Sequence, residues 1–588
     1  MRLPLISLLF LKSVFAAVYT DPSLLPNSPY TYIVVGSGPG GSVLANRLSA
    51  NPNNRVLLIE VGPSDTVNPN IRVPFLCTKL VPADVSWNDT TVPQTGLGGR
   101  SIGYPRGRTL GGSSSINYMV WTRGPASDFN RLAHETGDHG WSWKSLRRIL
   151  TGVETLVPPP DGHDTTGEID PSIHGSNGPV KISLHDKTAF DSRIFKATSQ
   201  LAEFPFNRDM NSGNPLGIGW TQFSIGDGQR SSASVSYLTP VLCRPNLDIL
   251  VNTLATKVVQ TGTQDGLPIF RGVEIAQSAS GPHFSRIATK EVIIAAGAVN
   301  TPQLLMLSGI GDSAELSRFN IRTIVDLPDV GKNMQDHVLL LNPFWVNSSS
   351  TGDDIGRDSR RSKDGLAQWE ASHTGPFAAS VGGNIGWFRL PKHSSIFRQV
   401  RDPSSGPHAP HYEFLTVNQF FSSIQAPPST GHFITIATIV LTPTSRGSIT
   451  LASANPFDSP NIDPALLNSD FDIFTMREAV KAALRFVAAP AFKDYVIGPF
   501  GDLAEAKTDA DIEAYVRSQS AHVFHPASTA YMSRKGSKRG VVNPDFSVKK
   551  TIGLRIVDGS VLPYVPAAHP SSNHLHHRGA SSGVDPCQ

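Results

Sequence analysis

Cysteine is scarce in this chain: Cys77, Cys243 and Cys587 are its only three among 588 residues. An odd number leaves at least one thiol unpaired, and so few bridges cannot replace a hydrophobic core. Their wide spacing also lacks the short repeats typical of metal sites. We therefore expect neither a disulfide scaffold nor a metal centre. A chain of this length has room for two or more domains with full cores.

The chain also lacks a large excess of charge of either sign. The formal net charge is +3, with 17% charged and 39% hydrophobic residues. This near-neutral balance gives no electrostatic ground for binding nucleic acid or an anionic membrane surface. The composition is that of an ordinary globular protein.

Long apolar runs are also absent, and spanning a bilayer takes about 20 apolar residues. Residues 1–17 (MRLPLISLLFLKSVFAA) have a basic second residue, a short apolar core and an Ala-Ala end, which is typical of a secretory signal peptide. The alternative is a buried first helix. We expect a secreted protein, in which the N-x-[ST] sequons at Asn88 and Asn347 are glycan acceptors.

The strongest signal that is present lies between residues 31 and 60. An apolar, β-branched run predicts a strand buried on both faces, and a helical pattern follows it. The G-x-G-x-x-G glycines between them are Gly36, Gly38 and Gly41. The first permits a tight turn, the second lets the backbone approach a pyrophosphate, and the third packs helix on strand. A second strand delivers Glu60, about 20 residues further on, where a carboxylate holds ribose hydroxyls.

This pattern predicts a dinucleotide site, although a purely structural βαβ turn is an alternative, and the motif does not separate FAD from NAD. Residues 105–124 add a Gly/Ser-rich loop whose backbone and hydroxyls suit a flat polar cofactor, or which is a plain loop. Residues 291–311 predict a strand, a turn and a helix. For that helix we expect Thr301 as N-cap, Pro302 as first residue and Gly309 as the stop.

These two blocks resemble the two signature sequences of the glucose–methanol–choline (GMC) flavoprotein oxidoreductases. The likeness extends from about residue 30 to about 569 and implies FAD as the cofactor. Among members, the chain resembles the fungal aryl-alcohol oxidases most. The segments that carry this are GRSIGYPRGRTLGGSSS, FNRDMNSGNPLGIGW, DGQRSSASVSYL, FDIFTMREAVKAALRF and VFHPAS.

The resemblance implies a mixed α/β fold with a discontinuous Rossmann-like FAD-binding domain and a substrate domain built on an antiparallel sheet with helices. The segments expected for the FAD-binding domain are 28–149, 226–339 and 526–588, and those for the substrate domain are 150–225 and 340–525. Two patterns support the second domain independently. Residues 432–442 alternate as a half-buried strand does, and residues 470–487 have the apolar stripe of an amphipathic helix.

Family FAD contacts carry over onto matching positions of this chain. They are Gly36, Gly38, Pro39, Gly40, Gly41, Glu60, Ser113, Asn117, Tyr118, Val120, Ala255, Asp558 and Gly559. Some members attach FAD covalently through a histidine in the first signature. Residues 109–120 contain neither His nor Cys, so we expect noncovalent FAD.

Oxidation of an alcohol removes a proton from oxygen and a hydride from carbon, so the protein must supply a base. A histidine suits this because its ordinary pKa of about 6.5 lies near working pH. His525 matches the family's catalytic histidine, and His569 matches the second position, where it would bond the alcohol. Phe420, Phe421 and Phe524 match aromatic residues at the substrate entrance, or are ordinary core.

The resemblance thus implies a secreted FAD-dependent oxidase of aryl or allylic alcohols that makes an aldehyde and reduces O₂ to H₂O₂. The alternatives are a GMC dehydrogenase using quinones, an oxidase of sugars or aliphatic alcohols, and a flavin-binding product without turnover. The last follows from the tail after His569, whose glycines, proline and few aliphatic residues depart from the family's closing helix. We expect this tail to weaken FAD binding. The sequence predicts no oligomeric state.

Overall fold

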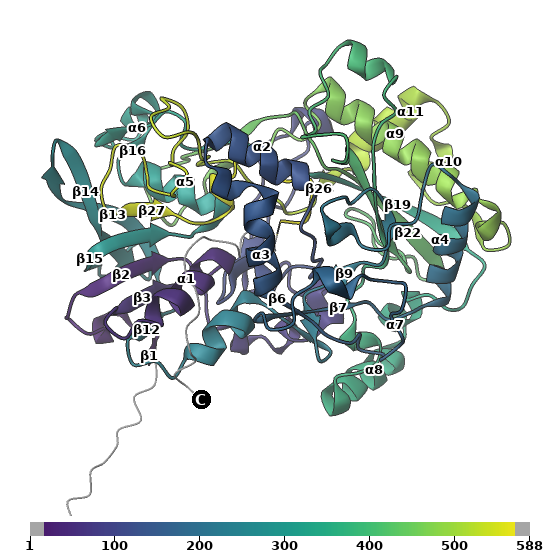
Figure 1. Ribbon diagram of the computed structural model, residues 1–588, viewed down its shortest axis with the longest axis horizontal. Helices are drawn as coiled ribbons and strands as arrows, with labels where there is room; N and C mark the ends of the chain where they lie inside the picture. The colour runs from purple at the N-terminus through teal and green to yellow at the C-terminus, as the bar shows by residue number, and fades with distance from the viewer. Residues whose placement is uncertain (1–16, 571–588) are drawn as a thin grey trace, which may run out of the picture.

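The computed structural model describes residues 17–570, whose two largest sheets lie side by side with helices around them (Figure 1). Five smaller sheets of two or three strands complete the described residues. The mixed α/β fold is confirmed. The predicted signal peptide and the tail from 571 to 588 lie outside the described residues, apart from Ala17. That residue begins the first strand, β1 (Ala17–Tyr19), which pairs with β12 (Leu247–Leu250).

The first sheet has eight strands in the order β1-β12-β3-β2-β15-β14-β13, and β27 also pairs with β15. The pairs from β1 to β15 and the β15–β27 pair are parallel, whereas β13, β14 and β15 are antiparallel. The bounds not yet given are β2 (Tyr30–Val35), β3 (Val56–Ile59), β13 (Leu254–Gln264), β14 (Leu267–Ala276), β15 (Phe284–Ile294) and β27 (Leu554–Ile556). Three distant parts of the chain therefore build one sheet.

The second sheet has seven strands and is antiparallel throughout, in the order β25-β19-β22-β21-β20-β8, with β26 also paired to β19. The bounds are β8 (Gly217–Gly219), β19 (Val338–Val346), β20 (Ile385–Phe388), β21 (Tyr412–Val417), β22 (Phe433–Val440), β25 (Val496–Pro499) and β26 (Ala521–His522). Its strands come from the segments expected for the substrate domain, with β19 beginning two residues early.

Helices cover both sheets (Figure 1). Beside the first sheet lie α1 (Pro39–Ser49), α5 (Gly297–Leu307) and α6 (Ser313–Arg318). Around the second lie α4 (Ala189–Gln200), α7 (Asp353–Arg357), α8 (Ser359–Ser372), α9 (Asp470–Val487), α10 (Asp502–Glu505) and α11 (Asp509–Gln519). Between them lie α2 (Ala126–Thr136) and α3 (Trp143–Val153).

Helix α9 spans the predicted residues, but the expectation of a half-buried strand at 432–442 is wrong. All eight residues of β22 are buried. Ile434 and Ile436 pack into the core that contains the α9 side chains, whereas Ala437 and Ile439 join a separate apolar cluster on the other face. The strand is covered on both sides, so alternation in its sequence does not mark a solvent face.

The predicted start of the 297–307 helix is also wrong. Helix α5 begins at Gly297, and Pro302 lies inside it. The Asp558 carboxylate accepts hydrogen bonds from the Gly297 N–H (2.9 Å) and the Thr301 hydroxyl (2.6 Å), so an outside carboxylate acts at this end instead of a Thr301 cap. Because Pro302 has no N–H, the Ala298 carbonyl lacks its helical donor, and the Thr529 hydroxyl donates to it at 2.7 Å.

A buried ionic network fixes the chain just before α2. Trp121 Nε1 donates to Glu154 (2.6 Å), Arg123 pairs with the same carboxylate, and His174 lies between Glu154 (2.6 Å) and Asp209 (2.9 Å). Burial alone lowers the pKa of His174, but hydrogen bonds to the two carboxylates outweigh this and raise the pKa to about 8. The network is thus held together by an imidazolium.

This charge makes stability depend on pH. The folded pKa of His174 exceeds its ordinary value of 6.5, so its contribution is complete below pH 6.5 and is lost as pH rises through about 8. We expect the apparent unfolding free energy to fall by about 2 kcal/mol over this window. Thermal or urea unfolding at several pH values should show a smaller fall in His174→Gln, while the exposed control His393→Gln keeps the wild-type fall. Equal pH dependence in wild type and His174→Gln would contradict the assignment.

Candidate active site

A cavity of about 640 Å³ lies between the two sheets. On one side it is lined by the turn from β2 to α1, the Gly/Ser-rich loop and the start of α5; on the other it is lined by β19, β21 and β22. It is thus closed by parts of the chain that the sequence assigns to different domains.

The turn after β2 leaves no room for side chains on two of its glycines. Gly36 has φ +96°, and a Cβ on it would lie 2.4 Å from the Ala295 carbonyl oxygen. A Cβ on Gly41 would lie 1.9 Å from the Gly36 carbonyl oxygen. Gly38 differs: no atom lies within 4 Å of its Cβ position, and the residue lines the cavity at the N-terminus of α1. An anion can therefore approach the helix N–H groups here.

Glu60 directly follows β3 at the cavity wall and is buried. Its carboxylate accepts bonds from the Ser37 N–H (2.9 Å), the Ser37 hydroxyl (2.6 Å) and the Gly62 N–H (2.9 Å). Burial raises the pKa of Glu60, and these bonds oppose the rise. These three bonds hold the Glu60 carboxylate beside the glycine turn between β2 and α1 (the phosphate turn).

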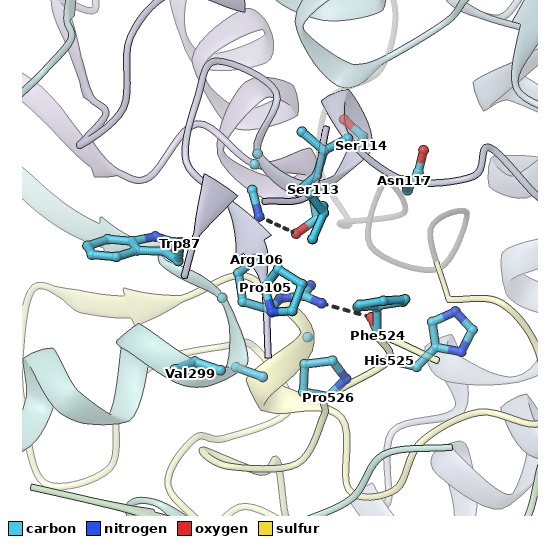
Figure 2. Close-up of a pocket in the computed structure, with 18 of the residues that line it drawn as sticks. Trp87, Pro105, Arg106, Ser113, Ser114, Asn117, Val299, Phe524, His525 and Pro526 are labelled. Carbon is cyan, nitrogen blue, oxygen red and sulfur yellow. Dashed lines mark hydrogen bonds between the residues drawn. The ribbon is translucent and has the colours of Figure 1, made fainter. Parts of the chain in front are cut away.

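A buried arginine that the sequence did not single out supports the Gly/Ser-rich loop. Arg230 donates to the Ser114 carbonyl (3.1 Å), the Asn117 side-chain oxygen (2.7 Å) and the Ile71 carbonyl (2.8 Å). Burial lowers the pKa of Arg230 to about 10. The loop is also fixed by the Ser113 hydroxyl, which accepts the Gly107 N–H at 3.1 Å (Figure 2).

Most of the predicted site residues line this cavity. They are Gly36, Gly38, Pro39, Gly40, Glu60, Ser113, Asn117, Tyr118, Val120, Ala255, Asp558, Gly559, Phe421, Phe524, His525 and His569. Gly41 lies behind the turn. Phe420 is outside the lining as well: it is buried against Phe433 (ring centroids 5.2 Å apart) and Phe500 (5.7 Å), so it packs as core.

His525 and His569 lie side by side, with ring centroids 4.7 Å apart and planes at 82°. Glu413 holds the second ring: it accepts from His569 Nε2 at 2.8 Å and from Trp387 Nε1, across the β20–β21 pair, at 2.6 Å. The Thr122 hydroxyl accepts the His569 N–H at 2.9 Å. The His569 ring is therefore fixed from the second sheet and its backbone from the first signature.

The segment before His525 has a strained backbone. Phe524 has φ +67°, which is unusual for a bulky residue. Its N–H donates to His522 Nδ1 (3.1 Å), and its carbonyl accepts from Arg106 Nη1 (2.8 Å; Figure 2). Both polar groups of the strained peptide are thus satisfied, which keeps the histidine loop in one conformation.

A buried carboxyl lies beneath this loop. Asp336 accepts the His525 N–H (2.8 Å) and the Tyr104 hydroxyl (2.5 Å). Burial raises the pKa of Asp336 to about 7 despite these bonds, and burial lowers the pKa of His522 to about 4. The sequence patterns did not single out Asp336 and Glu413. The signal for both was a carboxylate next to or inside an apolar run, in QDHVLLL and HYEFLTV.

Comparison with known proteins shows the family of this chain. Two family models described as GMC oxidoreductase match residues 30–339 and 443–574. The chain belongs to the GMC oxidoreductase family. It is 40% identical over 575 residues to "Dehydrogenase eriK" of Hericium erinaceus, covering 95% of this chain and 94% of that one. It is 39% identical over 573 residues to "Pyranose dehydrogenase 3" of Leucoagaricus meleagris, covering 94% and 92%.

Solved structures of two fungal oxidases share the fold. A formate oxidase variant from Aspergillus oryzae, studied for FAD modification, matches with TM-score 0.85 and 28% identity over 94% of this chain and 97% of that one. A fungal aryl-alcohol oxidase matches with TM-score 0.79, 24% identity and coverage of 94% and 98%, which is a likeness of fold.

FAD is the cofactor that the family indicates, and the residues present fit it. The open space at Gly38 faces the N-terminus of α1, as a diphosphate requires, and Glu60 stands at the end of the next strand, as a ribose requires. The Gly/Ser-rich loop lies against Gly38, since a Cβ on Gly112 would come within 2.7 Å of the Gly38 Cα, and the two histidines line the same cavity. One elongated ligand can therefore reach from Glu60 to the histidines.

Other features of the described residues bear on partners. Within 17–570, no helix is long and apolar enough to cross a membrane. The same residues contain no group of three His, Cys, Asp or Glu suited to a metal ion. Asn88 and Asn347 are both exposed, so their side chains are accessible.

The space at Gly38 gives a sharp test of the FAD position. In Gly38→Ala no protein atom meets the new methyl group, so folding should be unchanged, but the methyl enters the space left for the diphosphate. We expect FAD affinity to fall at least about tenfold, or ~1.4 kcal/mol. The measurement is flavin released by acid precipitation per protein. Gly152→Ala, in open space on α3, is the control and should keep full occupancy. Full occupancy in Gly38→Ala would refute this placement.

Proposed function

We propose that this protein oxidises primary aryl or allylic alcohols to aldehydes with FAD and passes the electrons to O₂, forming H₂O₂. The observation that carries the proposal is that His525 and His569 lie side by side in the wall of the FAD cavity. Apolar residues of the second sheet line the same cavity. FAD, when bound, supplies the hydride acceptor at flavin N5. The protein must then bind the alcohol and remove its hydroxyl proton.

His525 serves as the base that takes this proton, and His569 bonds the alcohol oxygen. Support for this division comes from their surroundings. His569 is anchored through both its ring and its backbone, by Glu413 and Thr122, as a group that orients a substrate should be. His525 is positioned through its backbone by Asp336.

The aryl preference is supported by the cavity wall. Its apolar members from the second sheet are Leu339, Leu341, Leu415, Val417, Ala437 and Ile439. Phe421 and Phe524 add aromatic rings, and Phe421 packs edge-on against Tyr118 at 6.1 Å. Such a surface favours a planar apolar substrate over a ring of hydroxyls, which needs many polar partners.

A second candidate is a dehydrogenase that oxidises a pyranose and reduces quinones. The identity of 37% to 39% with proteins named pyranose dehydrogenase favours it. A stopped-flow panel separates the two. We expect a benzylic alcohol to reduce the flavin, and so bleach it, faster than an aliphatic alcohol or glucose does. The flavin absorbance should then recover in O₂, with one H₂O₂ formed per aldehyde. Faster bleaching by glucose, with recovery only on adding a quinone, would establish the second candidate.

We further propose noncovalent FAD and secretion. The first is supported by the absence of His and Cys from residues 109–120, and the second by the sequence of residues 1–17 together with exposed sequons at Asn88 and Asn347. The acid precipitation described above also tests the FAD linkage, because covalently bound flavin would remain in the precipitate. Peptide mapping of secreted protein tests cleavage and glycosylation.

The catalytic assignment predicts the effect of removing the base. His525→Ala should lower the rate of flavin reduction by a benzylic alcohol by roughly 10²-fold or more. His569→Ala should also slow reduction, because the alcohol loses its partner. The exposed His393→Ala is the matched control and should reduce at the wild-type rate. The assignment fails if His525→Ala, with normal flavin content, reduces at nearly the wild-type rate.

A further inference from the structure

His522, the last residue of β26, has hydrogen bonds that fix the state of its ring. It is buried and lines the cavity three residues before the proposed base. Its Nε2 lies 2.8 Å from the Gly103 carbonyl oxygen, and its Nδ1 lies 3.1 Å from the backbone nitrogen of Phe524. A carbonyl oxygen only accepts a hydrogen bond, and a backbone N–H only donates one. His522 therefore carries its proton on Nε2, and its Nδ1 is an unprotonated acceptor.

Two aromatic rings hold the His522 ring in this orientation. Tyr104 packs on it with ring centroids 4.2 Å apart and planes at 31°. The Phe524 ring meets it edge-on, with centroids 4.5 Å apart and planes at 73°. On β19 the residue opposite His522 is the uncharged Val338, preceded by the buried His337, whose Nδ1 lies 3.0 Å from Nδ1 of His525. The ring of His522 is thus a fixed acceptor for the Phe524 N–H.

The bond to this acceptor matters because Phe524 has a left-handed φ of +67°, which a bulky residue keeps only when its surroundings hold it. Its carbonyl accepts from Arg106 Nη1, and the next N–H, of His525, donates to Asp336 (Figure 2). A carboxyl that gains a proton still accepts through its other oxygen. A ring nitrogen that gains a proton becomes a donor instead. His522 is therefore the contact of this segment that one proton can abolish.

We propose that His522 is a positioning residue: its neutral Nε2–H form holds Phe524 in the left-handed conformation, and a second proton, on Nδ1, releases residues 523–526, which carry His525. This inference rests on the proposed function of His525 as the base. A proton taken from solvent on Nδ1 makes both ring nitrogens donors. Two N–H groups then face each other where one hydrogen bond was, and the strained peptide loses its acceptor.

The charged and titratable groups around His522 set the pH at which this happens. Burial lowers the pKa of His522 to about 4, and the Arg106 cation acts in the same direction. The Asp336 carboxyl lies 3.6 Å from Nδ1, and the Tyr104 phenol bonds that carboxyl. Because the folded pKa lies below the ordinary value of 6.5, the stabilisation from neutral His522 is complete above pH 6.5. It is lost as pH falls to about 4.

Two substitutions of His522 separate this role from simple packing. His522→Leu fills similar space without an acceptor, whereas His522→Asn can present Oδ1 where Nδ1 was and does not titrate. At pH 8 we expect the limiting rate of flavin reduction by a benzylic alcohol to fall at least about tenfold in His522→Leu, because a base that is displaced reacts slowly. His522→Asn should keep most of the wild-type rate.

His411→Leu is the matched control, because His411 has the same kind of bonds but is not among the residues that line the cavity. Its Nδ1 accepts the Leu390 N–H at 3.0 Å, and its Nε2 lies 2.9 Å from Asp402. This variant should reduce flavin at the wild-type rate at equal flavin content. An equal loss of rate in His522→Leu and His522→Asn would overturn the proposal.

Hydrogen–deuterium exchange measures the opening of this segment without turnover, which matters in acid because His525 titrates there as well. The amides of Phe524 and His525 are followed in a proteolytic peptide of the FAD-loaded protein, with rates corrected for the intrinsic effect of pH. At pH 8 we expect both amides to be protected in the wild type and in His522→Asn, and to exchange faster in His522→Leu. Unprotected amides in the wild type at this pH would contradict the inference, whether or not the variants fold.

Acid gives the second expected result. Between pH 6.5 and about 4, protection in the wild type should fall relative to that in His522→Asn by roughly tenfold per pH unit, since opening takes up one proton. Asp336 also titrates, but it is present in both proteins and cancels in this ratio. A ratio that does not change with pH would show that His522 does not release the segment. These outcomes are separate from the proposed function, which fails instead if His525→Ala reduces flavin normally.

Discussion

The active site depends on one constraint: a polar group buried where the two sheets meet costs free energy unless it finds a hydrogen-bond partner. Asp336 satisfies it for the loop that carries His525, and Glu413 satisfies it for the ring of His569. Each carboxyl is shared with an aromatic donor, Tyr104 or Trp387, from another segment. Moving either histidine would therefore leave more than one buried group unpaired, which is why two side chains from the far C-terminal part of the chain keep one geometry.

Cofactor binding and chemistry use opposite devices in the same cavity. At the turn between β2 and α1, cofactor binding requires that side chains be absent. Gly36 and Gly41 lie against backbone atoms, and Gly38 faces open space. At His525 and His569, by contrast, the site is built from side chains and a loop that hydrogen bonds to Asp336 and Glu413 hold in place. The Gly/Ser-rich loop also lines this cavity, and the buried Arg230 donates hydrogen bonds to it. A cationic residue outside the cavity lining can thus govern how well both halves of the site are aligned.

The sequence was sufficient for local features and for those carried by family motifs. Gly36, Gly38, Glu60 and both histidines line one cavity, and each belongs to a short pattern with its own physical logic. The start of α5 was missed, since its anchoring carboxylate, Asp558, is more than 250 residues away. The expectation for β22 was wrong, and the choice for Phe420 between entrance and core stayed open, because burial depends on packing partners from other segments. Asp336, His337, Arg230 and Glu413 are buried polar residues whose partners come from distant segments, so a local pattern can mark a buried carboxylate but not the group that it bonds.

The order of strands in the first sheet has a consequence for how the protein is made. Strand β15 pairs with β2 near the N-terminus and with β27 near the C-terminus. Ribosomes add about 5–20 residues per second, so roughly 10 to 50 seconds pass between synthesis of β15 and of β27. During that time one edge of β15 lacks its neighbour and Asp558 is not yet present to cap α5. The nascent chain therefore carries an open sheet edge, and a complete FAD pocket forms only near the end of translation.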